Sequence, residues 1–98
     1  MRPKRVIEAS WLGGRVVRVV FADGLVRELD FAGALPGILE SIDTDEAFAA
    51  VGVDQLAGTV AWPGGIDLDP DVLRGDAQPV STVKPLLVRE YRLQATGS

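Results

Sequence analysis

Residues 15–31 read RVVRVVFADGLVRELDF, and the fold class follows from their pattern. Its first and last seven residues are rich in β-branched and apolar side chains, and their order alternates as in strands with one buried face. The apolar residues on the expected core face are Val17, Val19, Phe21, Leu25, Leu29 and Phe31. Between the two halves, Ala22-Asp23-Gly24 is a tight-turn signal, because Gly24 can adopt a positive φ. The stretch therefore predicts two antiparallel strands.

Similar signals extend the sheet on both sides of this stretch. Residues 5–12 predict a strand, and Gly13-Gly14 is a turn signal that joins it to the next strand. Three consecutive strands with short turns imply an antiparallel β-meander. Further along the chain, residues 51–54 and 58–62 predict a short hairpin, and Pro63 ends its second strand.

Short helices are expected beside the sheet. Asp43 is a candidate N-cap, with Glu46 in capping-box spacing, and this predicts a helix over residues 44–50 that Gly52 ends. Asp69-Pro70-Asp71 predicts a second helix start, since proline suits the first helical position. An apolar i, i+3, i+4, i+7 spacing predicts one more helical turn, formed by Leu35, Ile38, Leu39 and Ile42. The fold class is therefore α+β, a small antiparallel sheet (β-meander plus hairpin) with one or two short helices.

The composition fits a single globular domain. The chain has 98 residues, of which 47% are hydrophobic, so it can bury a core. It has no cysteine and no histidine, which excludes disulfides, thiolate and histidine catalysis, and most zinc and copper sites. No apolar run is long enough to span a membrane, and no signal-peptide core follows the basic start, so we expect a cytoplasmic protein.

The net charge of −4 is unevenly distributed along the chain. Residues 28–76 hold eleven acidic side chains and one basic side chain, whereas residues 1–27 and 77–98 are net basic. An acidic middle disfavours direct nucleic-acid binding, because it repels a phosphate backbone. The basic ends could contact an acidic partner or the acidic middle of a second copy, or they could be solvated faces of one small domain.

Three alternating aspartates are the strongest candidates for metal or catalytic chemistry. Asp67, Asp69 and Asp71 resemble the start of a calcium loop. However, Val72 occupies the sixth position, where glycine is needed, and Gln78 occupies the twelfth, where a bidentate glutamate is needed. We therefore expect strand-end and helix-start roles for these carboxylates, and no catalytic, cofactor-binding or metal-binding residue.

Aromatic and basic side chains on the strands each allow two interpretations. Trp62 fits a core or interface anchor better than a nucleotide-stacking platform, because few basic residues surround it. Arg15, Arg18 and Arg27 could form a basic patch on adjacent strands. The alternative is cross-strand pairing of Arg18 with Glu28, on the face opposite the core.

The order of these motifs resembles one known family. The segments that carry the resemblance, within residues 5–76, are Val19-Val-Phe-Ala-Asp-Gly24, Glu28-Leu-Asp-Phe31, Val51-Gly-Val-Asp54 and Gly58-Thr-Val-Ala-Trp-Pro-Gly-Gly-Ile-Asp-Leu-Asp-Pro-Asp-Val-Leu73. They are similar to a small bacterial family catalogued as domain of unknown function 2442. The resemblance implies a compact α+β domain with a curled antiparallel sheet and no assigned catalytic residues.

The resemblance also bears on the two ends of the chain. Some members of the family carry a C-terminal helix-turn-helix, and others are encoded beside another small protein in arrangements that resemble toxin–antitoxin pairs. We expect one domain over residues 1–76 and an extension over 77–98, too short for a helix-turn-helix, that adds an edge strand or a tail. Its segment 86–95 could cover its own sheet edge, pair with a second copy, or bind a partner by strand addition.

These observations favour a non-enzymatic protein-binding module, an antitoxin-like partner of another small protein. The candidate contact residues are Trp62, Asp67, Asp69 and Asp71. The expected partner is another small protein or a second copy, with no cofactor, membrane or small-molecule substrate. The alternative is a DNA-linked regulatory domain that acts through an oligomer or a partner. A carboxylate- and metal-dependent hydrolase is less favoured, because it requires the aspartates to converge in a pocket.

Overall fold

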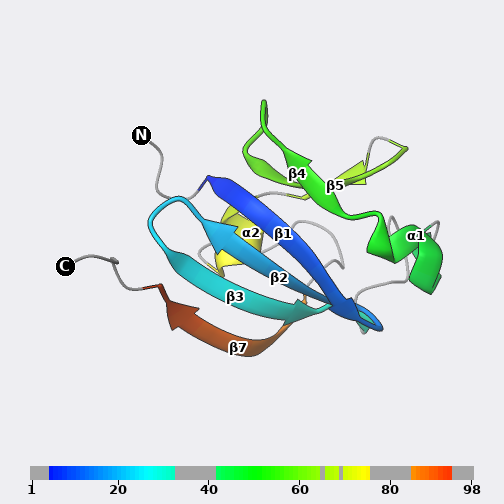
Figure 1. The fold of residues 1–98 in the computed structure, drawn as a ribbon, viewed down its shortest axis with the longest axis horizontal. Helices are drawn as coiled ribbons and strands as arrows, with labels where there is room; N and C mark the ends of the chain where they lie inside the picture. The colour runs from blue at the N-terminus through cyan, green and yellow to red at the C-terminus, as the bar shows by residue number, and fades with distance from the viewer. Residues whose placement is uncertain (1–4, 33–41, 65, 69, 76–84, 94–98) are drawn as a thin grey trace.

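The computed structural model describes residues 5–32, 42–64, 66–68, 70–75 and 85–93, which form two antiparallel sheets and two short helices (Figure 1). The larger sheet has the order β1-β2-β3-β7, with β1 Val6–Gly13, β2 Val16–Phe21, β3 Leu25–Asp30 and β7 Leu86–Arg92. The smaller sheet has the order β4-β5-β6, with β4 Gly52–Asp54, β5 Thr59–Trp62 and β6 Ile66–Asp67. The helices are α1 Asp45–Ala49 and α2 Pro70–Arg74. The expected antiparallel sheet, hairpin and short helices are confirmed, and sheet predominates.

The alternating residues of β2 and β3 build the core. Val17, Val19 and Phe21 are fully buried on one face of β2, as the alternation predicts. Leu29 of β3 lies opposite Val17 in the register and is buried with it. Figure 1 shows α2 behind the sheet, and the face turned to the viewer carries no further described helix or strand. One face of the large sheet is therefore covered by α2. The other, called the open face below, carries no described helix or strand, although its Val20 and Val26 side chains are buried.

Three aromatic rings extend this core toward the smaller sheet. Phe31, Phe48 of α1 and Trp62 of β5 are all buried. Their ring centroids lie 5.1 to 6.0 Å apart, and the rings of Phe31 and Trp62 meet edge to face. Tilted and edge-to-face ring pairs stabilise a core beyond the area they bury. These contacts hold α1 and the smaller sheet against the meander.

The start of α1 differs from the sequence-based expectation by one residue. Thr44 caps the helix, because its hydroxyl accepts a hydrogen bond from the Ala47 N–H at 3.1 Å. Asp43, the expected cap, instead forms an ion pair with Arg15. Both residue types are good N-caps, so a contact distant in sequence decided between them.

Other helix boundaries were predicted with mixed success. Gly52 belongs to β4 and does not end α1, because the chain leaves the helix at Ala50. Gly75 ends α2 with a φ of +85°, as expected of a glycine after a helix. The expected helical turn over 35–42 lies outside the described residues except for Ile42, which is buried. None of the helices in the described residues is long and apolar enough to cross a membrane.

Candidate functional site

β7 forms one edge of the large sheet, and its apolar side chains are exposed. Leu86, Leu87 and Val88 are 67%, 48% and 57% exposed, and Leu93, directly after the strand, is 54% exposed. Within the described part of the chain, no strand lies on the outer side of β7. An exposed apolar edge strand is the arrangement that pairs with a strand of another chain.

The opposite edge of the large sheet is occupied. The Val6 N–H of β1 donates a hydrogen bond to the Gly58 carbonyl at 2.9 Å, and β4 and β5 lie beside β1 (Figure 1). This close approach requires glycine, because a Cβ at position 58 would lie 2.8 Å from the Arg5 Cγ and the backbone φ is +69°. β7 is therefore the accessible edge of this sheet.

A buried cation on the core side holds β7 in place. Arg27 lies on the core face of β3, opposite Val19 on one side and Glu90 on the other. Its guanidinium donates a hydrogen bond to the Leu73 carbonyl at 2.7 Å. Its Nε lies 2.9 Å from the Glu90 Oε1 as an ion pair, without an aligned hydrogen bond. A buried charge needs such partners, so Arg27 is a core residue and does not contribute to a surface basic patch.

A second ionic contact holds the end of β7 to the turn between β2 and β3. Asp23 accepts hydrogen bonds from Arg74 of α2 and lies 3.3 Å from Arg92 of β7. The Leu93 N–H donates a hydrogen bond to the Gly24 carbonyl at 2.8 Å. Arg74 contributes most to holding the pKa of the Asp23 carboxyl well below its ordinary value. The carboxylate therefore keeps its charge, and with it both arginine contacts, in mildly acidic solution.

The hydrogen-bond pattern determines which peptide groups of β7 are available. Leu93 bonds toward β3, and neighbouring residues of an antiparallel strand bond to opposite sides. The peptide groups of Glu90 and Arg92 therefore point away from β3. A bulge leaves Val88 without a register partner. Bulges limit indiscriminate edge pairing, so regular main-chain pairing is available from Arg89 onward, and Leu86, Leu87 and Val88 offer exposed apolar side chains beside it.

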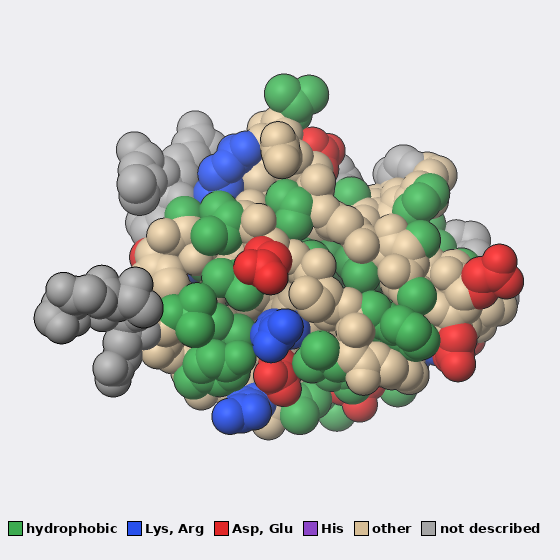
Figure 2. Space-filling view, in the orientation of Figure 1, with side chains coloured by type: hydrophobic (Ala, Val, Ile, Leu, Met, Phe, Trp, Pro, Cys, Tyr) green, Lys and Arg blue, Asp and Glu red, His purple; other side chains and the backbone are tan. Residues whose placement is uncertain are grey.

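Charged side chains alternate across the open face of the large sheet. Arg18 of β2, Glu28 of β3 and Arg89 of β7 are successive register partners, and Arg18 lies opposite Glu28 as the pairing alternative predicted. Figure 2 shows this face, with basic and acidic side chains alternating in a row between apolar groups. The adjacent apolar row consists of Val20, Val26 and Tyr91. At the edge, the Arg89 guanidinium lies 4.9 Å from the Tyr91 ring centroid.

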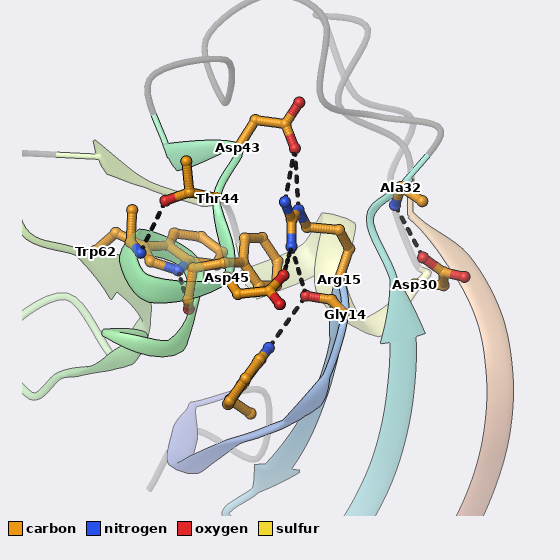
Figure 3. Close-up of polar contacts among 11 residues, drawn as sticks. Gly14, Arg15, Asp30, Ala32, Asp43, Thr44, Asp45 and Trp62 are labelled. Atoms are coloured by element: carbon orange, nitrogen blue, oxygen red, sulfur yellow. Dashed lines mark hydrogen bonds and ion pairs between the residues drawn. The ribbon is translucent and has the colours of Figure 1, made fainter.

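A third ionic cluster among the described residues is structural. Arg15, in the turn after β1, bonds to Asp43 at 3.0 Å and to Asp45 at 2.7 Å, and it also donates to the Gly14 carbonyl (Figure 3). The guanidinium also lies 5.6 Å from the Phe48 ring centroid. These contacts attach the start of α1 to the meander, and they engage both carboxylates.

The structure places Trp62 in the core. Its side chain is 3% exposed, and its indole N–H donates a hydrogen bond to the Phe48 carbonyl at 2.9 Å. Figure 3 shows it beside the helix that follows Thr44. A side chain this buried cannot reach a partner without disrupting the core, so the expected contact role of Trp62 gives way to a packing role.

The three candidate aspartates receive only a backbone placement. Asp67 ends β6 and Asp71 belongs to α2. The side chains of both, and the whole of Asp69, lie outside the described residues. Where side chains are described, no group of three or more Asp, Glu, His or Cys residues could hold a metal ion.

The fold and the exposed edge define a small α+β domain, mostly antiparallel sheet, with an additional edge strand. The chain belongs to the family described as "Protein of unknown function (DUF2442)", whose model matches residues 6–79, so the membership expected from the motifs is confirmed. β7 begins beyond the matched residues. No curated protein and no solved structure matches the chain.

Proposed function

We propose that this chain is a non-enzymatic protein-binding module that takes up an extended segment of another protein alongside β7. The observation that carries the proposal is the exposure of Leu86, Leu87 and Val88 on an edge strand. A partner strand would remove these side chains from water, and full burial of one Leu or Val contributes about 1.5–3 kcal/mol. The outward peptide groups of Glu90 and Arg92 would supply main-chain hydrogen bonds.

The proposal includes the kind of partner. We infer that the partner is another small protein, in the antitoxin-like arrangement that the family resemblance implies. We also infer that the chain is cytoplasmic, which cell fractionation tests. The DNA-linked alternative is less favoured, because two arginines of the suggested basic patch already have carboxylate partners. Arg15 pairs with Asp43 and Asp45, and Arg27 pairs with Glu90.

Affinity capture from a native extract of the source cells tests the proposal with full-length baits. The baits are the wild-type chain, Val88→Lys and Leu56→Lys. Lysine on an edge strand opposes strand pairing, because a partner strand would take its charge out of water. Leu56 is 98% exposed in the turn between β4 and β5, so Leu56→Lys makes a comparable change away from β7. We expect one stoichiometric protein on the wild-type and Leu56→Lys baits, and about tenfold less on Val88→Lys.

Equal retention of that protein by all three baits would contradict strand addition at β7. Leu86→Lys repeats the test at a second exposed edge position. Far-UV circular dichroism of each bait distinguishes a lost contact from a lost fold. A captured protein that Val88→Lys and Leu86→Lys both fail to hold, while remaining folded, supports the proposal.

A further inference from the structure

The row of charges on the open face ends at the sheet edge with a basic residue. Arg18, Glu28 and Arg89 alternate in sign on β2, β3 and β7 (Figure 2). Side chains directly opposite each other on one face of an antiparallel sheet interact, and opposite charges stabilise the pair. One further strand beside β7 would therefore bind best with a carboxylate next to Arg89.

We propose that β7 selects a partner strand with Asp or Glu opposite Arg89 and an apolar residue two positions away, opposite Tyr91. This inference rests on the proposed function, because it specifies the partner of the same edge. The two-residue spacing follows from the register, in which Arg89 and Tyr91 share the open face. The contact of the Arg89 guanidinium with the Tyr91 ring, at 4.9 Å, keeps the cation at that face, where a neighbouring carboxylate can reach it.

A second copy of β7 could not place a carboxylate opposite Arg89. Glu90 is the one acidic residue of the strand, and it lies on the core side with Arg27. Directly opposite residues of two antiparallel strands lie on the same face of the sheet. Arg89 would therefore meet Arg89 or Tyr91 of a second copy, and not Glu90. Arg89 opposite Arg89 is destabilising, and neither contact supplies the carboxylate that would pair with Arg89, so the favoured occupant is a segment of a different protein that carries one.

Selection from a random peptide library, displayed on phage against the immobilised full-length chain, tests this specificity. We expect a consensus that contains an apolar residue, any residue, and Asp or Glu. A synthetic consensus peptide should bind Arg89→Glu about fivefold more weakly than the wild type, the size of reversing one cross-strand charge pair. A peptide with lysine in place of the acidic residue should prefer Arg89→Glu. Arg18→Glu is the matched control, since it makes the same change on the same face away from the edge.

The outcomes separate this inference from the proposed function. Peptides that lose binding in Val88→Lys, but show no acidic preference or no exchange of preference in Arg89→Glu, would overturn the inference and leave strand addition standing. No selected peptide, or peptides that bind wild type and Val88→Lys equally, would overturn both. Size-exclusion chromatography over a concentration series gives an independent test: a dimer that Val88→Lys abolishes would show a second copy at this edge, against the inference.

Discussion

The Arg27 Nε lies 2.9 Å from the Glu90 Oε1, and this ion pair joins β3, inside the family match, to β7, which lies beyond it. The same guanidinium donates a hydrogen bond to the Leu73 carbonyl near the end of α2. One buried cation thus contacts the sheet, a helix and the additional edge strand. Because Arg27 also bonds to the Leu73 carbonyl and Glu90 is half-exposed, the ion pair couples the position of β7 to the core modestly.

Replacing this cation should destabilise the fold. Arg27→Met keeps an aliphatic stem but removes the charged hydrogen bond to the Leu73 carbonyl, so we expect the free energy of unfolding to fall by about 2 kcal/mol. Glu90→Gln should cost less than about 1 kcal/mol, because the Glu90 carboxylate is half-exposed. Urea unfolding followed by tryptophan fluorescence measures both. Arg18→Met, on the open face, is the control, and equal losses for Arg27→Met and Arg18→Met would contradict the core role of Arg27.

The Asp23 contacts predict a specific dependence of stability on pH. The pKa of this carboxyl is lowered in the folded protein, chiefly by Arg74, whereas the unfolded chain has the ordinary value of 3.8. In acid, the folded state therefore binds fewer protons than the unfolded state. The stabilisation that the Asp23 contacts give the folded state is present above the ordinary pKa and is lost as the pH falls through the lowered value. Urea midpoints measured from about pH 6 down to about pH 3 should fall more steeply for the wild type than for Asp23→Asn. Parallel curves would exclude this contribution.

The helix cap provides a test of the assignment to Thr44. Thr44→Ala removes the acceptor of the Ala47 N–H and should lower the free energy of unfolding by about 1 kcal/mol. Thr44→Ser keeps a hydroxyl at the same position and should retain most of that stability. Urea unfolding compares the two variants with the wild type. If Thr44→Ala and Thr44→Ser lose the same amount, the hydroxyl is not the stabilising group.

Two glycines with positive φ allow the stability cost of backbone strain to be distinguished from the cost of a side-chain collision. A Cβ at Gly75 would lie 2.8 Å from an Arg27 guanidinium nitrogen, whereas a Cβ at Gly64 would meet nothing within 4 Å. Both substitutions to alanine place a side chain at positive φ, which costs about 1–3 kcal/mol. Gly75→Ala should lose more, because Arg27 is held by two partners and cannot move freely. Thermal unfolding measures the difference, and equal losses would indicate that the Arg27 contact contributes nothing.

Local patterns predicted much of the meander and little of its polar chemistry. The alternation over 15–31 predicted β2, β3 and the buried face that contains Val17 and Phe21. The same alternation places Arg27 on that buried face, but a charge at a core position requires partners that pattern analysis cannot supply. Those partners, the Leu73 carbonyl and Glu90, come from α2 and β7, far along the chain.

The sequence left the place of Trp62 in the fold open. Trp62 was compatible with a core or an interface position, and its packing beside Phe31 and Phe48 decided for the core. The sequence did contain a signal for the exposed apolar edge, namely the run Leu86-Leu87-Val88 in the extension. That run is exposed because the side chains of an edge strand pack against one neighbouring strand only.

The strands of the meander, their core face and the family could be predicted from the amino-acid sequence, because alternation and turn glycines act over a few residues. Four features depend on the three-dimensional packing: Thr44 caps α1, the buried Arg27 pairs with Glu90, Trp62 is internal, and β7 covers the edge of β3. Each of these outcomes depends on groups remote in sequence reaching the same place, where burial makes an unpaired charge or peptide group costly.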